Sequence, residues 1–557
     1  MRKRATNGDL SVQAIAGTYV SLLGLDIKPG SSMLDGLLGF GVWKRNNATG
    51  KDGWLPGIKR FKTDADEPAT NKLTSTRTHP VQGFMWSDYA AKEGTEYTYR
   101  VVPMYGAPGA IEEGDGVEIT FKTERENGST HGVYFNRGAA ASQAYARRFN
   151  NQPPHRQNNP DAYPWLSRGL EDGMRKFIRR AKKEGLKIRA AVYEFHYDGI
   201  LQELAKAARD GVDVQIVHDC KKGEKKPGAR NVQAIEDAGL GDEAKCVGRA
   251  SNPSYISHNK FIVLVDGQKG VAVWTGSTNI TEGGIFGHSN LAHVVNDPDV
   301  AEKYHKYWKQ LWKDPAAGDL REWTEKHTPV PDDGLPKGTT VIFSPRGSLE
   351  ALEYYAKLMD DAKSSVFFTA AFGVNKKLRS VLATDKPYLR YLLLESEDDP
   401  EIDDPNIKKY QRDRQNLVAV GSLLDEDVLE TWVRTNFGDE ELTGLNKHVR
   451  YIHTKYMLID PLSSDPIVIT GSANFSDAST KNNDENMLII RGNKRVADIY
   501  LGEFMRLYTH YRFRGIAQQQ KLAGKPPEKL FLAPDHSWTQ PYYDDSRAKY
   551  YERRLFA

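Results

Sequence analysis

Cysteine is scarce in this sequence, because its 557 residues include only Cys220 and Cys246. Two cysteines cannot build a disulfide scaffold, and no Cys-x-x-Cys pair is present to hold a structural zinc ion. Long apolar runs are also lacking, since no stretch reaches the roughly 18 residues that cross a bilayer. The basic residues 2–4 are not followed by the apolar segment of a signal peptide. We therefore expect a protein of the reducing cytoplasm, without a transmembrane segment or a structural metal.

A strong excess of one charge is absent too. The chain has 77 Lys and Arg residues against 74 Asp and Glu, which gives a net charge of +3. The overall charge therefore does not predict a nucleic-acid partner, and any basic surface must be local. Hydrophobic residues make up 39% and charged residues 27% of the chain, as in soluble globular proteins. The length predicts several domains.

Residues 1–125 contain short segments rich in β-branched and aromatic residues, separated by turn signals such as Pro29-Gly30. This pattern predicts β-strands. The predicted strand segments are 12–25, 37–43, 84–89, 97–105 and 117–122. The alternating tyrosines of 94–102 resemble a late strand of a fibronectin type III sandwich. We expect an accessory domain like a β-sandwich that binds a protein partner or gates a cleft elsewhere in the chain.

From about residue 130, predicted strands alternate with predicted helices. Segments 186–195 and 212–220 read as strands on either side of a helix at 197–209, and the alternation returns over 349–394. Such alternation predicts an α/β fold with mixed, mostly parallel sheets flanked by helices. We expect two α/β halves, 126–335 and 336–516. An aromatic-rich segment, 517–557, should be extended and packed on the body.

The two expected halves share one motif at a constant offset of 195 residues. The residues His258, Lys260, Gly276, Ser277 and Asn279 recur as His453, Lys455, Gly471, Ser472 and Asn474. Residues i and i+2 of a strand point to the same face, so each His shares a face with its Lys. Each Gly-Ser-x-Asn turn adds hydroxyl, amide and backbone donors. The repeat predicts one duplicated unit whose two copies carry the same chemistry.

This pair of segments resembles the phospholipase D superfamily, whose signature is HxK(x)4D followed by GSxxN or GSxN. The resemblance covers residues from about 130 to 515. It implies that the two halves are related by a pseudo-twofold axis and that both histidines meet in one site, complete within a single chain. It also implies phosphodiester cleavage through a phosphohistidine, without metal or cofactor. By resemblance His258 is the nucleophile and His453 the acid and base, although the near-symmetry leaves the reverse assignment open.

The residue types of the motif suit that chemistry. Lys260 and Lys455 would neutralise the non-bridging oxygens of a phosphodiester, an anion that otherwise repels nucleophiles. Further donors would come from Ser277, Asn279, Ser472 and Asn474. A neutral imidazole can attack phosphorus, and a protonated imidazole can give its proton to the leaving oxygen. Imidazole suits both tasks because its ordinary pKa, about 6.5, lies near working pH.

Departures from the family pattern make the two copies unequal. The acidic position of the signature is Asp460 in the second copy but Val265 in the first. Glu485 stands where the family often places a carboxylate that orients a histidine, whereas the first copy has Asn290. A carboxylate beside an imidazole stabilises its charged form, so unequal partners predict unequal histidines. The same departures leave open a catalytically inactive scaffold on this fold.

A basic loop follows one predicted strand of the first half. Its members are Lys221, Lys222, Lys225, Lys226 and Arg230. Such a loop suits a polyanionic substrate. The segment 471–476 resembles the GSxNF form of small bacterial nucleases of the family, which favours a nuclease that cleaves DNA or RNA. A phospholipase D or phosphatidyltransferase acting on phospholipid headgroups is the alternative, because the same chemistry serves both substrates.

Overall fold

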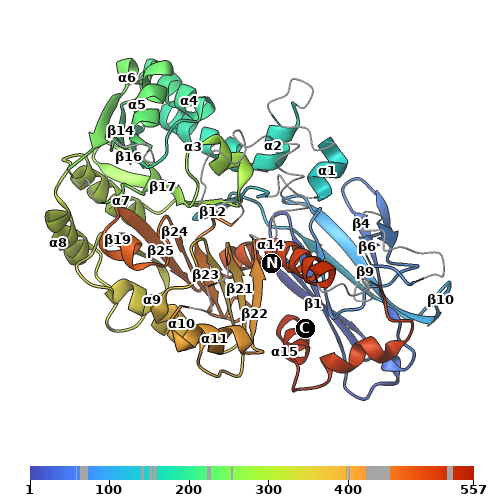
Figure 1. The fold of residues 1–557 in the computed structure, drawn as a ribbon. Coiled ribbons are helices and arrows are strands. Elements are labelled where there is room, and N and C mark those ends of the chain that lie inside the picture. The colour runs from blue at the N-terminus through green and yellow to red at the C-terminus, as the bar shows by residue number, and fades with distance from the viewer. Residues whose placement is uncertain are drawn as a thin grey trace.

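The structure is a computed structural model. It describes residues 1–57, 59–62, 73–138, 143–149, 154, 160–221, 227–251, 255–396, 398, 402–421, 452–522 and 531–557. Figure 1 shows sheet-rich N-terminal residues in blue on one side of the molecule and two helix-flanked sheets on the other. Among the described residues, no helix combines the length and the apolarity needed to cross a bilayer.

The N-terminal region forms two antiparallel sheets around a shared core. The first sheet has the order β1 (Arg2–Asn7), β2 (Leu10–Ala16), β3 (Ser21–Ile27) and β8 (Met85–Asp88). The second has the order β10 (Ala110–Glu113), β9 (Glu96–Ala107), β4 (Gly39–Asn46) and β5 (Asp52–Trp54), with β11 (Val117–Lys122) also on β9. Two short strands, β6 (Pro56–Gly57) and β7 (Thr74–Ser75), pair with each other. The likeness to fibronectin type III stays a prediction.

Residues 12–25 belong to two strands of this region rather than one. Val12 lies in β2 and Leu25 in β3, and the two residues are cross-strand partners. Both side chains are buried in the core between the sheets, together with Tyr99 and Ile119. The segment looked continuous because both strands turn apolar residues inward.

The first α/β half is built on a seven-stranded sheet. Its order is β12 (His131–Phe135), β18 (Leu291–Val295), β17 (Lys269–Gly276), β16 (Lys260–Asp266), β13 (Lys187–Val192), β14 (Val214–Asp219) and β15 (Lys245–Arg249). Its helices are α1 (Gln143–Phe149), α2 (Ala162–Ser167), α3 (Leu170–Glu184), α4 (Asp198–Arg209), α5 (Gly228–Asp237), α6 (Leu240–Glu243), α7 (Pro298–Leu311) and α8 (Ala317–His327). Helix α3 buries Leu170, Met174, Phe177 and Ile178, which lie on one face at helical spacing.

The second half repeats this sheet strand for strand. Its order is β19 (Gly338–Ser344), β25 (Glu485–Arg491), β24 (Ile467–Gly471), β23 (Tyr456–Ile459), β20 (Ser365–Ala370), β21 (Leu389–Leu394) and β22 (Asn416–Val420). Its helices are α9 (Glu350–Asp360), α10 (Lys376–Leu382), α11 (Pro405–Arg412), α13 (Asp477–Lys481) and α14 (Lys494–Leu522). The mixed α/β architecture with two duplicated halves confirms the fold class expected from the sequence.

One detail of that expectation was wrong. Among the described strands of these two sheets, parallel pairing joins only β13 to β14 to β15, and β20 to β21 to β22. The other neighbouring strands of both sheets are antiparallel. Strands β16 and β17 follow each other through a tight turn, without the helical crossover that a parallel pair requires. The sheets are therefore mixed but mostly antiparallel.

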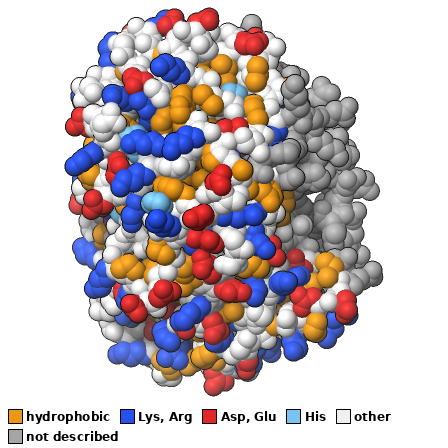
Figure 2. Space-filling model, turned by 90° about the vertical axis from the view of Figure 1, so that its left-hand side faces the viewer, with side chains coloured by type: hydrophobic (Ala, Val, Ile, Leu, Met, Phe, Trp, Pro, Cys, Tyr) orange, Lys and Arg blue, Asp and Glu red, His pale blue; other side chains and the backbone are white. Residues whose placement is uncertain are grey.

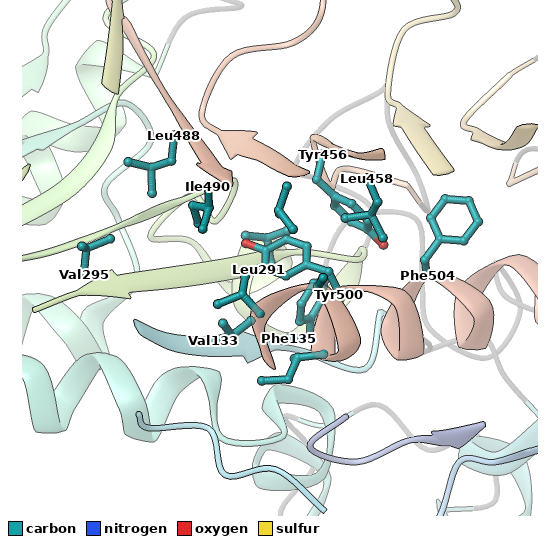
Figure 3. Packing of buried hydrophobic residues seen from close by; sticks show 14 of the residues in the cluster. Val133, Phe135, Leu291, Val295, Tyr456, Leu458, Leu488, Ile490, Tyr500 and Phe504 are labelled. Atoms are coloured by element: carbon teal, nitrogen blue, oxygen red, sulfur yellow. The ribbon is translucent and has the colours of Figure 1, made fainter. Parts of the chain in front are cut away.

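The two halves share one hydrophobic core. Figure 3 shows Phe135 and Leu291 of the first half near Tyr456 and Tyr500 of the second, in the cluster that buries all four. The ring of Phe135 lies edge-on to both tyrosines, with centroids 5.9 Å from Tyr456 and 5.2 Å from Tyr500. The same cluster contains Phe261 of β16 and Leu458 of β23, so the strands that follow the two motif histidines share one core.

From the sequence we expected an extended C-terminal segment, but the described part of this segment is largely helical. Helix α14 continues to Leu522, a 3-10 helix spans His536–Tyr542, and α15 covers Ala548–Phe556. Tyr542 packs on Phe84 in the N-terminal core, and Phe556 is buried in the core of the two halves. The aromatic residues therefore lie on short helices that connect the N-terminal sheets with the second half.

Candidate active site

Each motif histidine lies a few residues before the start of a strand, close to its lysine partner. His258 and Lys260 precede and begin β16, and His453 and Lys455 immediately precede β23. All four side chains are buried. In each copy the lysine donates to the backbone carbonyl of its own histidine, over 2.7 Å from Lys260 Nζ and 2.6 Å from Lys455 Nζ. The two copies of the motif therefore fold in the same way.

Each histidine is oriented by a residue of the other half. Nδ1 of His258 lies 2.9 Å from both carboxylate oxygens of Glu485. Nδ1 of His453 lies 2.9 Å from Oδ1 of Asn290. Glu485 begins β25, whereas Asn290 immediately precedes the equivalent strand β18. The rings are also close enough that the charge of His258 lowers the pKa of His453. The two half-sites thus exchange partners and form one cluster.

The serines of the two Gly-Ser turns hold these partners in place. Ser472 Oγ donates to Oε2 of Glu485 at 2.7 Å, and Ser277 Oγ donates to Oδ1 of Asn290 at 2.8 Å. The amide nitrogen of Asn290 donates to the carbonyl of Gly284, which fixes Oδ1 toward His453. From the sequence we expected both serines to donate to a phosphate. Their hydroxyl hydrogens are instead engaged by the groups that orient the rings.

The Nδ1 contacts decide which ring nitrogen remains for chemistry. Burial works to raise the pKa of Glu485, but His258 and Lys260 outweigh it and hold the pKa below its ordinary value. Glu485 is therefore a carboxylate that can only accept, so His258 carries its hydrogen on Nδ1. The fixed amide of Asn290 sets the same tautomer on His453. Each neutral ring then has its lone pair on Nε2, as a nucleophile requires.

Burial favours the neutral form of both histidines. It lowers the pKa of His258 to about 4, although Glu485 opposes the shift. Burial also lowers the pKa of His453, and the charge of Lys455 adds to that effect. The two rings have unequal partners, a carboxylate on one side and a neutral amide on the other. An imidazolium is therefore better stabilised on His258 than on His453.

The two lysines lose part of their basicity in the same way. Burial lowers the pKa of Lys260 to about 8, against the opposing pull of Glu485 and Glu194. Burial and repulsion from Lys260 lower the pKa of Lys455 below its ordinary value. Two ammonium groups that repel each other over a buried site will bind an anion placed between them.

Glu194 belongs to this cluster although no sequence motif singled it out. It lies two residues beyond β13 and accepts a hydrogen bond from the side-chain amide of Asn279. Burial raises the pKa of Glu194 to about 7, while Lys260 and Asn279 oppose the shift. One amide hydrogen of Asn279 is therefore engaged by a carboxylate. The only available signal was the position of Glu194 at the end of an apolar strand.

Two more rings flank the histidines and were missed by the sequence analysis. The ring centroid of Tyr193 lies 5.0 Å from that of His258, and the centroid of His288 lies 4.7 Å from that of His453. His288 is buried, and its Nε2 atom has no hydrogen-bond partner among the described residues. The second half has Asn483 at the position equivalent to His288. Neither ring stands inside a repeated motif, so spacing gave no signal.

Asp460 does not join the cluster, which corrects its assignment from the family signature. It follows β23 at the end opposite to Lys455, roughly 16 Å along the strand. Its carboxylate accepts hydrogen bonds from the backbone of Lys363, Ser364 and Ser365. Asp460 therefore anchors the loop that leads into β20.

The basic loop is described only in part. Lys221 is buried, and its charge acts on Asp484, the residue before Glu485. Arg230 is exposed on α5 and close enough to Glu194 for its charge to lower the pKa of that carboxyl group. Lys222, Lys225 and Lys226 lie outside the described residues.

A pocket of about 110 Å³ opens beside the motif of the second half. Its lining consists of residues 369–375 with Lys455, Asn474, Phe475 and Ser476. The side-chain oxygen of Asn474 is buried there without a hydrogen-bond partner among the described residues. In the part of the chain that the structure describes, no three His, Cys, Asp or Glu side chains converge in the manner of a metal site.

Comparison with known families agrees with this duplicated cluster. A family model described as "Cardiolipin synthase, PLD-like domain" matches residues 174–312 and 392–508, one segment in each half. Each matched segment contains one motif histidine with its lysine. The chain is a phospholipase D-like protein with two halves. The phosphodiesterase-type activity expected from the sequence agrees with that family.

Several solved structures match parts of this chain. Phosphatidylserine synthase of Haemophilus influenzae is 14% identical, with a TM-score of 0.44, over 70% of this chain and 93% of that one. The phospholipase D family member Nuc of Salmonella typhimurium is 24% identical, with a TM-score of 0.23, over 33% and 95%. Polyphosphate kinase of Porphyromonas gingivalis is 13% identical, with a TM-score of 0.38, over 58% of this chain and 46% of that one. A search of curated proteins finds no match.

Proposed function

We propose that this phospholipase D-like protein hydrolyses phosphodiesters through a covalent phosphohistidine and that its substrate is nucleic acid. The observation that carries the proposal is the reciprocal pairing of His258 with Glu485 and of His453 with Asn290. This pairing presents two Nε2 atoms from opposite halves, beside two buried lysines. Such an arrangement suits attack on phosphorus from one side and proton transfer on the other.

In the first step, Nε2 of His258 attacks phosphorus and the bond from phosphorus to the leaving oxygen breaks. Lys260 and Lys455 bind the non-bridging oxygens of the phosphodiester. The negative charge of the bound phosphodiester offsets the repulsion between these lysines and a protonated imidazole. The protonated ring of His453 has no carboxylate partner and is therefore the stronger acid, so it gives its proton to the leaving oxygen. His258 is the nucleophile because its phosphorylated ring is cationic, and Glu485 is the partner that stabilises that charge.

In the second step, the neutral His453 takes a proton from water. The resulting hydroxide attacks phosphorus and the bond from phosphorus to Nε2 of His258 breaks. The products are one alcohol and one phosphomonoester, and His453 regains the proton that the next cycle needs. Each step transfers one proton and exchanges one bond at phosphorus, so the two histidines are restored.

Local positive charge supports nucleic acid as the substrate. Arg230 is exposed and its charge lowers the pKa of Glu194, and in the sequence it follows the lysines of the basic loop. Figure 2 shows acidic and basic side chains interspersed over the face on the left of Figure 1. The attraction for a polyanion must therefore be local, as the small net charge implies.

Incubation with single- and double-stranded DNA and RNA in EDTA tests the proposal. We expect strand cleavage by the wild-type protein and none by His453→Ala. If nucleic acid stays intact while phospholipid vesicles release their headgroups, the substrate is phospholipid and not nucleic acid. Failure to turn over any phosphodiester, including an aryl one, would leave the fold as a scaffold without this activity.

A further inference from the structure

The two half-sites differ in one pair of matched residues. Strands β13 and β20 occupy equivalent places in the two sheets, and each ends beside the motif strand. Glu194 follows the last residue of β13 by two positions, and Phe372 follows the last residue of β20 by two positions. Equivalent backbone positions therefore carry a carboxylate in one half and an aromatic ring in the other.

In the first half-site, the carboxylate of Glu194 can accept a further hydrogen bond. Oε2 of Glu194 accepts from Asn279, whereas Oε1 forms no hydrogen bond within the described residues. Glu194 is partly exposed, so a ligand in the site can reach it. Lys260, the exposed Arg230 and Lys455 stabilise its charge. A bound phosphate would draw on both lysines and leave Glu194 beside an anion, which is unfavourable unless another donor replaces them.

The aromatic side offers no such acceptor. Phe372 is 54% exposed, the largest exposed fraction among the large hydrophobic residues of the described chain. It lines the pocket of about 110 Å³ together with Phe475, next to Lys455. An alcohol arm without a donor group can bind there by apolar contact. The two arms of a phosphodiester therefore meet different chemistry on the two sides of phosphorus.

We propose that Glu194 makes the first half-site a recognition site for a hydroxyl or primary ammonium group on one alcohol arm of the phosphodiester. The arm without that group binds on the side of Phe372, so the substrate enters in one orientation. This inference rests on the proposed phosphodiesterase function and adds the chemical group that the site recognises.

Four p-nitrophenyl phosphodiesters test this recognition, with 2-aminoethyl, 2-hydroxyethyl, ethyl or 2-(trimethylammonio)ethyl as the second arm. A hydrogen bond to a charged group predicts that wild-type kcat/KM for the first two exceeds that for the ethyl ester by about tenfold to a hundredfold. Glu194→Gln should reduce these ratios toward one. Glu118→Gln, the same change at an exposed position of β11, should keep them.

The last ester separates charge from hydrogen bonding, because its ammonium group has no N–H. If this ester equals the 2-aminoethyl ester, or if all four esters react equally, the proposal is overturned while turnover itself still supports the phosphodiesterase function. If no ester is turned over, calorimetric binding of 2-aminoethyl phosphate and ethyl phosphate decides instead. Equal affinities, or a preference that Glu194→Gln retains, would overturn the proposal.

Discussion

At the residue scale, the partner of each imidazole sets its task. His258 has a carboxylate at Nδ1 and His453 has an amide, although the two motifs are otherwise equivalent. The carboxylate can stabilise a cationic, phosphorylated ring, and the amide can only fix a tautomer. The difference of one residue type between Glu485 and Asn290 therefore breaks the symmetry of the site.

Glu485→Gln tests that asymmetry. The amide removes the charge that stabilises the phosphorylated His258, so we expect kcat to fall by about 10²-fold. Steady-state kinetics with an aryl phosphodiester in EDTA measures the effect. The matched change Asn290→Asp adds a carboxylate to His453 and should raise the pKa of that ring, which moves the pH profile. Full activity in Glu485→Gln would contradict the assignment of the nucleophile.

The lysines predict a pH dependence. The pKa of Lys260 is lowered to about 8, and a lysine loses its charge as the pH rises through its pKa. We therefore expect kcat/KM to fall above about pH 8, because the phosphate then loses a cationic partner. Lys260→Arg keeps its charge to higher pH and should move this fall upward. If kcat/KM of Lys260→Arg falls at the same pH as that of the wild type, Lys260 is not the group whose titration causes the fall.

At the scale of elements, strand pairing places the groups that orient the histidines. Strand β24 ends at Gly471, and β25 begins with Glu485, whose Oε2 accepts from Ser472. A Cβ atom at Gly471 would lie 2.1 Å from the carbonyl oxygen of Asn486, so this position admits no side chain without movement of the backbone. The close approach of the two strands therefore sets the position of Ser472 relative to Glu485.

Gly471→Ala tests this close approach. The clash involves backbone atoms, so we expect a loss of about 2 kcal/mol in the free energy of unfolding and a large loss of activity. Gly53→Ala is the control, because a Cβ atom at Gly53 would meet no atom within 4 Å. Thermal unfolding followed by circular dichroism compares the two variants. Equal melting temperatures would contradict the account of this strand pair.

The sequence predicted local features better than distant pairings. The spacing of His258 and Lys260 predicted that both lie on one strand, and the structure begins β16 at Lys260, two residues after His258. That Glu485 would orient His258 of the other half was not predictable, since packing of the two sheets decides it. Asp460 was misplaced because the signature gave its spacing but not the loop that its carboxylate binds. Glu194 and His288 enter the cluster only through tertiary structure.

At the scale of the whole molecule, buried charge also joins the two halves. Arg249 ends β15 in the first half, and its Nε donates to Asp484 of the second half at 2.8 Å. The same guanidinium binds Asp314 through Nη1. Arg249 is 1% exposed, and Asp484 is followed directly by Glu485. The ion pair therefore links the interface of the halves to the group that orients His258.

Arg249→Met tests this link, because it leaves Asp484 buried without its cation. We expect a loss of about 3–5 kcal/mol in stability, together with reduced activity through displacement of Glu485. Arg547→Met is the control at an exposed ion pair, for which we expect a change of about 1 kcal/mol or less. Denaturant unfolding measures both. A loss as small in Arg249→Met as in Arg547→Met would contradict a structural role for the buried pair.

The central claim is that His258 forms a covalent bond to phosphorus and that His453 is needed to release it. Mass spectrometry of peptides from His453→Ala, quenched during reaction with a p-nitrophenyl phosphodiester in EDTA, tests it most directly. p-Nitrophenolate leaves without an acid, so the account predicts that the phosphorylated peptide containing His258 accumulates. No adduct in this variant, together with turnover that persists in His258→Ala, would contradict the account.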